Sequence, residues 1–124
     1  MRVITPALLV EAVTELSKAT PLVRARDVFA WCERNSVDYQ GEGLRKQAIW
    51  DADREEARGQ NRLLKFKSGE SKQSRVGWSL PSRGARAREA AMRLGWAEQF
   101  WDGENWTWPS TPIPSAATQV AQVA

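Results

Sequence analysis

The spacing of the apolar residues changes near residue 60 from the period of a helix to the period of a strand. Before that point apolar side chains recur every three or four residues, which predicts helices over about 6–19, 25–35 and 44–58. After it, apolar residues alternate with basic or small ones along 64–67 and 75–80, which predicts two strands joined by a polar connection. We therefore expect a mainly helical α+β domain.

Capping and turn signals mark the boundaries of these elements. Thr5 and Pro6 are typical of a helix start, and Gly59 is typical of a helix end. A fourth helix is expected from a cap at Ser82 to about residue 94, and the pair Asp102-Gly103 between aromatic residues predicts a small hairpin. The expected organisation is a folded domain over 1–94, a tryptophan-rich extension over 95–108 and a disordered tail over 109–124.

Several classes of functional site need residues that this chain lacks. It has no histidine and a single cysteine, Cys32, which excludes an internal disulfide and the tetrahedral Cys/His zinc sites. It has no glycine-rich phosphate-binding motif either, so we expect no enzyme activity, no cofactor and no metal. No apolar run reaches the roughly 20 residues of a membrane helix, and the first residues do not resemble a secretory signal. The expected protein is soluble and cytoplasmic.

The positive charge of the chain is concentrated in one segment. Residues 61–93 carry nine basic and two acidic side chains, whereas 1–60 carry nine basic and ten acidic ones, and 94–124 carry three acidic ones. A concentrated basic segment favours a polyanionic partner, because each phosphate that it neutralises releases counterions. The alternative is a solvated basic face without a partner.

Two segments carry a resemblance to a known family. PALLVEAVTELSKATPLVRARDVFAW covers the first two predicted helices, and RVGWSLPSRGARA covers the second long strand and the start of the fourth helix. With the order of elements over residues 6–94, they resemble the winged helix-turn-helix modules found as HARE-type domains and at the N-terminus of Mrr-type restriction enzymes. The resemblance implies three helices and a β-hairpin wing, followed here by a C-terminal helix and the tryptophan-rich extension.

The resemblance also implies a helix in the major groove of double-stranded DNA and a wing along the backbone or the minor groove. Arginine forks would read base edges, and the lysines of the wing would contact phosphates. The residues so placed are Arg45, Lys46, Trp50 and Arg54 of the third helix, Lys65, Lys67, Lys72 and Arg75 of the wing, and Arg83 and Arg86 of the fourth helix.

The third helix departs from this pattern because it is also acidic. Residues 41–60 carry four basic and five acidic side chains. Three explanations stay open: the carboxylates face away from the groove, the wing leads the contact, or the fold binds protein. Its inner stripe is expected to be Leu44, Ala48 and Ala52, and Trp50 either packs on its own domain or stacks on a base. The acidic side chains are expected to form a solvated face; they are Asp51, Asp53, Glu55 and Glu56.

Aromatic residues gather after the fourth helix. They cap the open side of the domain or form a surface for a second copy or another protein, because tryptophan is enriched at the centre of interfaces. A homodimer joined through this region would fit the two-fold dimers that many DNA-binding domains form. The residues are Trp96, Phe100, Trp101, Trp106 and Trp108.

Two functions remain in view. The first is a small DNA-binding regulator, of transcription or of a phage or other mobile element, that acts by occupying a site. The alternative is a protein-interaction module, such as an inhibitor that binds a host nucleic-acid-processing complex.

Overall fold

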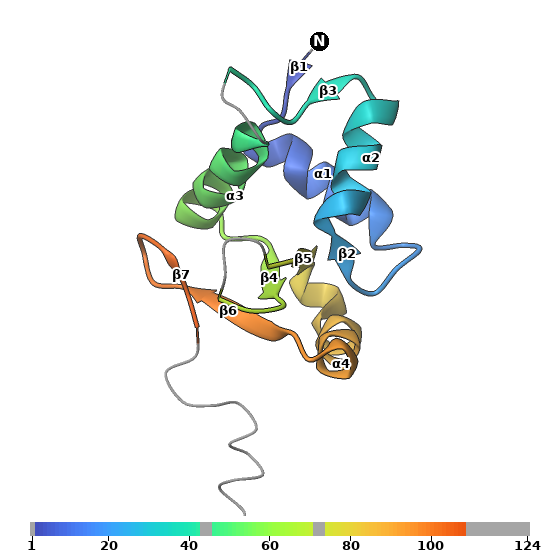
Figure 1. Cartoon of the computed structure of the whole chain (residues 1–124), viewed down its shortest axis with the longest axis vertical. Coiled ribbons are helices and arrows are strands. Elements are labelled where there is room, and N and C mark those ends of the chain that lie inside the picture. The colour runs from blue at the N-terminus through green and yellow to red at the C-terminus, as the bar shows by residue number, and fades with distance from the viewer. Residues whose placement is uncertain (1, 43–45, 71–73, 109–124) are drawn as a thin grey trace, which may run out of the picture.

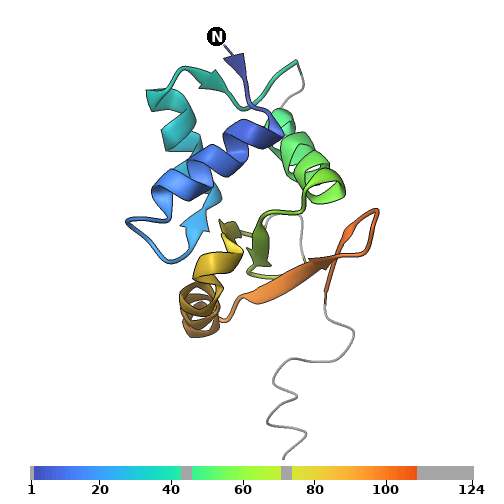
Figure 2. The same ribbon diagram turned by 180° about the vertical axis from the view of Figure 1, so that it is seen from behind.

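The computed structural model describes residues 2–42, 46–70 and 74–108. Within these ranges the chain forms four α-helices and a five-stranded antiparallel sheet, which is an α+β fold as the apolar spacing predicts. Three helices gather on one side of the sheet and the fourth lies on the other side of strand β4 (Figure 1). Figure 2 gives the view from behind, with α1 in front of α2.

The first helix carries the start signal that the sequence predicts, whereas Gly59, the predicted end signal of the third helix, is the last residue inside that helix and the left-handed residue that follows is Asn61. Helix α1 (Pro6–Leu16) begins with proline, and the Thr5 side chain accepts a hydrogen bond from the backbone N–H of Leu8 at 3.2 Å. Helix α2 (Ala25–Arg34) packs against α1, and so does helix α3 (Gln47–Gly59). Leu44, the first residue of the inner stripe expected for the third helix, lies outside the described residues. The buried apolar residues of α3 are Ile49, Ala52 and Ala57, so that stripe is partly wrong.

The sheet places the strands in the order β2-β5-β4-β6-β7, with every neighbouring pair antiparallel. Strands β4 (Leu64–Lys67) and β5 (Val76–Ser79) are the two predicted strands, and Lys65 pairs with Trp78 in their register. The short strand β2 (Val23–Arg24) lies beside β5. On the other side of β4 follow β6 (Ala97–Trp101) and β7 (Trp106–Thr107), the hairpin that Asp102-Gly103 predicts. The tryptophan-rich extension therefore continues the sheet.

Helices cover both faces of this sheet. Trp78 packs in a core with Val13 of α1, Trp31 of α2 and Ile49 of α3. Phe66 packs on the other face in a second core. The remaining buried members of that second core are Leu22, Ala87, Ala91 and Trp96.

Helix α4 (Gly84–Leu94) closes the second core, and its start differs from the prediction. A 3₁₀ turn, η1 (Pro81–Arg83), precedes it, and no side chain caps the first turn of α4. The expected cap at Ser82 is therefore wrong. The helix ends at Gly95, whose φ of 76° is the left-handed conformation that glycine adopts most readily.

A parallel pair of two-residue strands was not predicted. Strand β1 (Arg2–Val3) pairs with β3 (Val37–Asp38) in a segment that the sequence indicates as a loop. Two residues are too few to show an alternating pattern, so no periodicity marks such strands. In the described part of the chain, no helix has the length and apolar character needed to cross a membrane.

Candidate nucleic-acid interface

Trp50 of α3 lies between two adjoining clefts on the side of the molecule formed by α2, α3 and the β4–β5 hairpin. One cleft has a volume of about 410 Å³ and the other about 540 Å³, and both are also lined by Ser74 and Val76. The Trp50 ring packs 6.0 Å from the ring of Trp78 and edge-on, at 6.4 Å, to the ring of Phe29. We call the two clefts together the Trp50 groove.

Cationic side chains surround the Trp50 groove. Arg24 and Arg26 come from the start of α2, and the Lys46 ammonium lies 4.5 Å from the ring centre of Phe29. Arg54 is half exposed and bonds to Asp51 at 2.5 Å, whereas the contact of Arg26 with Asp27 is long, at 4.0 Å. Besides the buried Lys65, the basic side chains that line the groove are Arg24, Arg26, Lys46, Arg54, Lys67 and Arg75.

Lys65 is not an exposed residue of the wing as the sequence predicts. Its side chain is 10% exposed and forms a salt bridge with Asp53, which also accepts a hydrogen bond from the Trp78 indole N–H at 3.1 Å. The Lys65 ammonium lies 5.2 Å from the ring centre of Trp106 and 6.0 Å from that of Trp50. The prediction fails because it assumed one solvated face of the sheet, whereas helices cover both. Lys65 ties β4 to α3 and is not free to meet a phosphate.

The expectation of a solvated acidic face on α3 is wrong for Asp53 and Glu56. Both are buried, at 1% and 2% exposed. Glu56 accepts a hydrogen bond from the backbone N–H of Arg62 at 2.7 Å and another from the Arg62 guanidinium at 2.7 Å. This hydrogen bond from the guanidinium raises the pKa of Arg62.

The other two carboxylates of α3 do not line the Trp50 groove, although Asp51 is bonded to Arg54 at the edge of the groove. Asp51 and Glu55 line a separate cleft beside Val3 and Ile4 of the N-terminal segment. The acidic residue that does line the groove, Asp53, is paired with Lys65. The first of the three explanations that the sequence left open, that the carboxylates face away from the groove, therefore holds only in part: Glu55 lies at another cleft, whereas Asp53 lines the groove and Asp51 is bonded to Arg54.

Lys67 is the second basic residue of β4 that lines the groove, after the buried Lys65. Partial burial lowers the pKa of Lys67, and the neighbouring charge of Lys65 lowers it further. An anion placed against Lys67 would favour its charged form, because an opposite charge offsets both effects. Arg75, in the connection to β5, is exposed, and its backbone N–H donates to the Ser68 hydroxyl at 2.8 Å.

The structure separates the predicted site residues into groups. Lys46, Trp50, Arg54, Lys67 and Arg75 come together around the Trp50 groove. Arg83 and Arg86 line a different cleft, between the end of α1 and the start of α4. Arg45 and Lys72 lie outside the described residues, as does the predicted tail over 109–124.

Sequence reasoning missed three residues of the Trp50 groove: Arg24, Arg26 and Phe29. The two arginines lie on either side of the first residue of α2. The resemblance implies that the start of the second helix lies beside the third helix, so it could have pointed to both arginines. Phe29 looks like an ordinary core residue in the sequence. In the structure Phe29 is half-buried, lines the groove and stacks on Tyr39 with ring centres 4.8 Å apart.

The predicted aromatic surface is partly buried. Trp96 is 9% exposed and belongs to the second core, so its assignment to a partner surface is wrong. Trp101 and Trp106 pack edge-on with ring centres 5.5 Å apart, and Trp106 also lines the Trp50 groove. Phe100 is 48% exposed, whereas Trp108 is half-buried.

In the ranges that the structure covers, no group of three or more histidine, cysteine or acidic side chains is placed to hold a metal ion. Comparison with protein-family models, with curated proteins and with solved structures returned no match. The geometry of the chain itself therefore carries the functional argument.

Proposed function

We propose that this chain is a winged helix-turn-helix domain that binds double-stranded DNA through the Trp50 groove. The order α1, β2, α2, α3, β4, β5, with β5 between β2 and β4 and the short β1–β3 pair apart from this sheet, supports this assignment. In it α3 is the recognition helix, and the β4–β5 connection is the wing.

The observation that carries the proposal is the group of five cations around Trp50, and the acidic residue that lines the groove is paired with Lys65. These cations are Arg26, Lys46, Arg54, Lys67 and Arg75, whereas the Arg24 guanidinium lies over the ring of Trp96, 5.3 Å from its centre. Lys46 and Arg54 enter the major groove on α3, where a guanidinium reads base edges. Lys67 and Arg75 of the wing, with Arg26 at the start of α2, contact phosphates. These contacts hold the register of the protein on the duplex, and the α3 contacts provide sequence preference.

A domain of this kind regulates by occupying its site. It has the features of a small regulator of transcription, including one that serves a phage or another mobile element, because binding alone blocks or recruits other proteins at the site. The basic groove provides the affinity that such a mechanism needs.

The test is binding to random-sequence duplex DNA, measured by fluorescence anisotropy. With about 6–10 phosphate contacts, affinity should fall by roughly 10³–10⁵ between about 50 and 200 mM salt. The double variant Lys67→Gln/Arg75→Gln should weaken binding to all sequences and reduce the salt slope by about 2.

The matched control is Arg34→Gln/Arg93→Gln. It removes the same amount of positive charge at two exposed positions. Neither position lines the Trp50 groove or the cleft that contains Arg83 and Arg86. It should bind like the unaltered chain, apart from a small effect of net charge. No binding at low salt, or equal losses in the two double variants, would contradict the proposal.

A second candidate function is a protein-interaction module, such as an inhibitor of a host nucleic-acid-processing complex. The exposed Phe100 on the β6–β7 hairpin favours it, because an aromatic side chain at the surface provides a contact point for a partner. The anisotropy measurement separates the two candidates, since this second function requires no salt-dependent affinity for DNA.

A further inference from the structure

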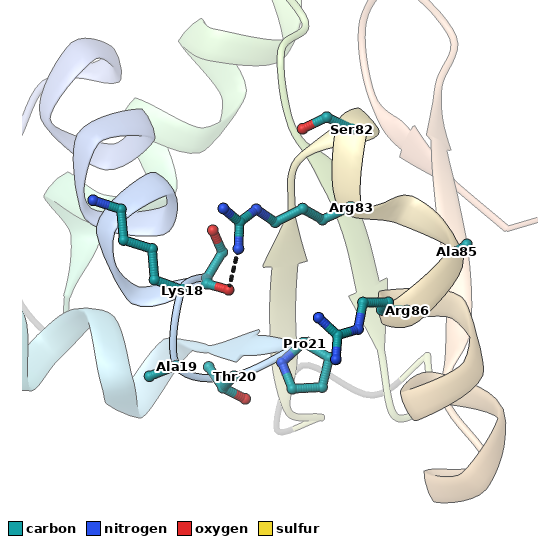
Figure 3. Close-up of a pocket in the computed structure, with 9 residues that line it drawn as sticks. Lys18, Ala19, Thr20, Pro21, Ser82, Arg83, Ala85 and Arg86 are labelled. Carbon is teal, nitrogen blue, oxygen red and sulfur yellow. Dashed lines mark hydrogen bonds between the residues drawn. The ribbon is translucent and has the colours of Figure 1, made fainter.

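A second basic cleft lies between the end of α1 and the start of α4, with a volume of about 500 Å³ (Figure 3). The turn that follows α1, residues 17–21, forms one wall. Ser82 and Arg83 of η1 and the first turn of α4 form the other wall. The side chains of Arg83 and Arg86 both extend from that wall toward the turn.

The charge of this cleft is positive throughout. Its basic lining residues are Lys18, Arg83 and Arg86, and none of its lining residues is acidic. Within the described part of the chain, no salt bridge engages any of the three. The first turn of α4 contains no acidic residue and no side-chain cap, so the positive end of the helix dipole adds to the same potential.

One of these cations is held in place. The Arg83 guanidinium donates to the backbone carbonyl of Ser17 at 2.8 Å, which fixes it at the mouth of the cleft and joins η1 to the end of α1 (Figure 3). A guanidinium has five N–H donors, so this bond leaves others for a ligand. The two arginine forks suit the oxygens of a phosphate.

This cleft is distinct from the Trp50 groove. The two share no lining residue. Helices α3 and α4 lie on opposite sides of β4 in both views (Figures 1 and 2). A duplex that is seated against α3 and the wing therefore leaves the α1–α4 cleft open.

We propose that the α1–α4 cleft binds the phosphate backbone of a second DNA segment, so that one copy of the chain bridges two duplexes. This inference rests on the proposed function, because the first duplex occupies the Trp50 groove. An extended polyanion fits better than a small anion, since Arg83 and Arg86 face the cleft from one wall while the Lys18 side chain points outward from the other wall (Figure 3).

The test is a two-duplex capture experiment. A short duplex is immobilised, the full chain is bound to it at low salt, and retention of a second, fluorescent duplex is measured. The variant Lys18→Gln/Arg86→Gln should bind the first duplex with an affinity within about twofold of the unaltered chain but lose about tenfold of the retained second duplex. Arg83 is left in place because it joins η1 to α1. The control Arg34→Gln/Arg93→Gln should retain both duplexes.

Each other outcome overturns the inference in a recognisable way. If the unaltered chain binds the first duplex and retains no second one, the cleft is not a DNA site. If Lys18→Gln/Arg86→Gln retains the second duplex fully, bridging arises elsewhere, as in a dimer with two Trp50 grooves. If this variant instead loses affinity for the first duplex, the cleft contacts the same duplex as the groove. If no first duplex binds at all, the proposed function itself fails, and the inference with it.

Discussion

At the scale of single residues, the arrangement of Asp53, Lys65 and Trp78 decides how the Trp50 groove is held. Asp53 bonds to residues of β4 and β5 at once, so α3 is fixed against the hairpin by a buried ion pair and an indole hydrogen bond. The sequence shows these residues as members of an acidic helix and a basic strand. Their burial depends on the register that places Lys65 opposite Trp78, and composition carries no information about that register.

Removal of the charge on Asp53 should destabilise the fold strongly. Asp53→Asn leaves the Lys65 ammonium buried without its partner, which costs about 3–5 kcal/mol of the free energy of unfolding. The double variant Asp53→Leu/Lys65→Met should recover much of that loss, because it removes both buried charges. Denaturant unfolding monitored by tryptophan fluorescence measures the free energy of unfolding of both variants. A loss below about 1 kcal/mol in Asp53→Asn would show that the pair is solvated.

At the scale of elements, the order of the long helices and strands follows from the sequence because each carries its own signal. Thr5 and Pro6 begin α1, and the Asp102-Gly103 pair makes the β6–β7 turn. What the sequence could not provide is the contact between elements. The alternation along β4 assigned Lys65 to a solvated face, and only the packing of α3 against β4 and β5 shows that this face is covered. The pairing of β6 with β4 has no local signal either.

The β6–β7 turn should respond to acid. Hydrogen bonds from the backbone N–H groups of Asn105 and Glu104, both at 2.7 Å, hold the pKa of Asp102 below its usual value. For a carboxyl whose pKa is lowered on folding, the stabilisation is present above the unfolded-state pKa and is lost as the pH falls through the folded one. The contact between the rings of Trp101 and Trp106 should therefore weaken only in acid.

NMR provides the measurement. The side-chain carbon of Asp102 should titrate below that of an unrestrained aspartate, and the cross-peaks between the two indole rings should fade in the same pH range. In Asp102→Ala these cross-peaks should be weak at every pH. An ordinary titration of Asp102, or unchanged cross-peaks in Asp102→Ala, would mean that other contacts hold the hairpin.

At the scale of the whole molecule, the fold divides the basic segment between two sites. The sequence predicted one continuous surface for DNA that included Arg83 and Arg86. In the structure those two residues lie at the α1–α4 cleft, while Lys46, Lys67 and Arg75 lie at the Trp50 groove together with arginines from α2. The distribution of charge along the sequence could not show this division. The division arises because β5 leads directly into η1 and α4, which lie on the other side of β4.

The central claim, that duplex DNA binds in the Trp50 groove, is tested most directly by NMR chemical-shift mapping with a short duplex at low salt. The proposed interface predicts that the largest changes fall on Lys46, the Trp50 indole, Lys67 and Arg75, with the signals of Arg34 and Arg93 unchanged. Changes confined to Phe100 and its hairpin, or the absence of any change at the Trp50 indole, would contradict it.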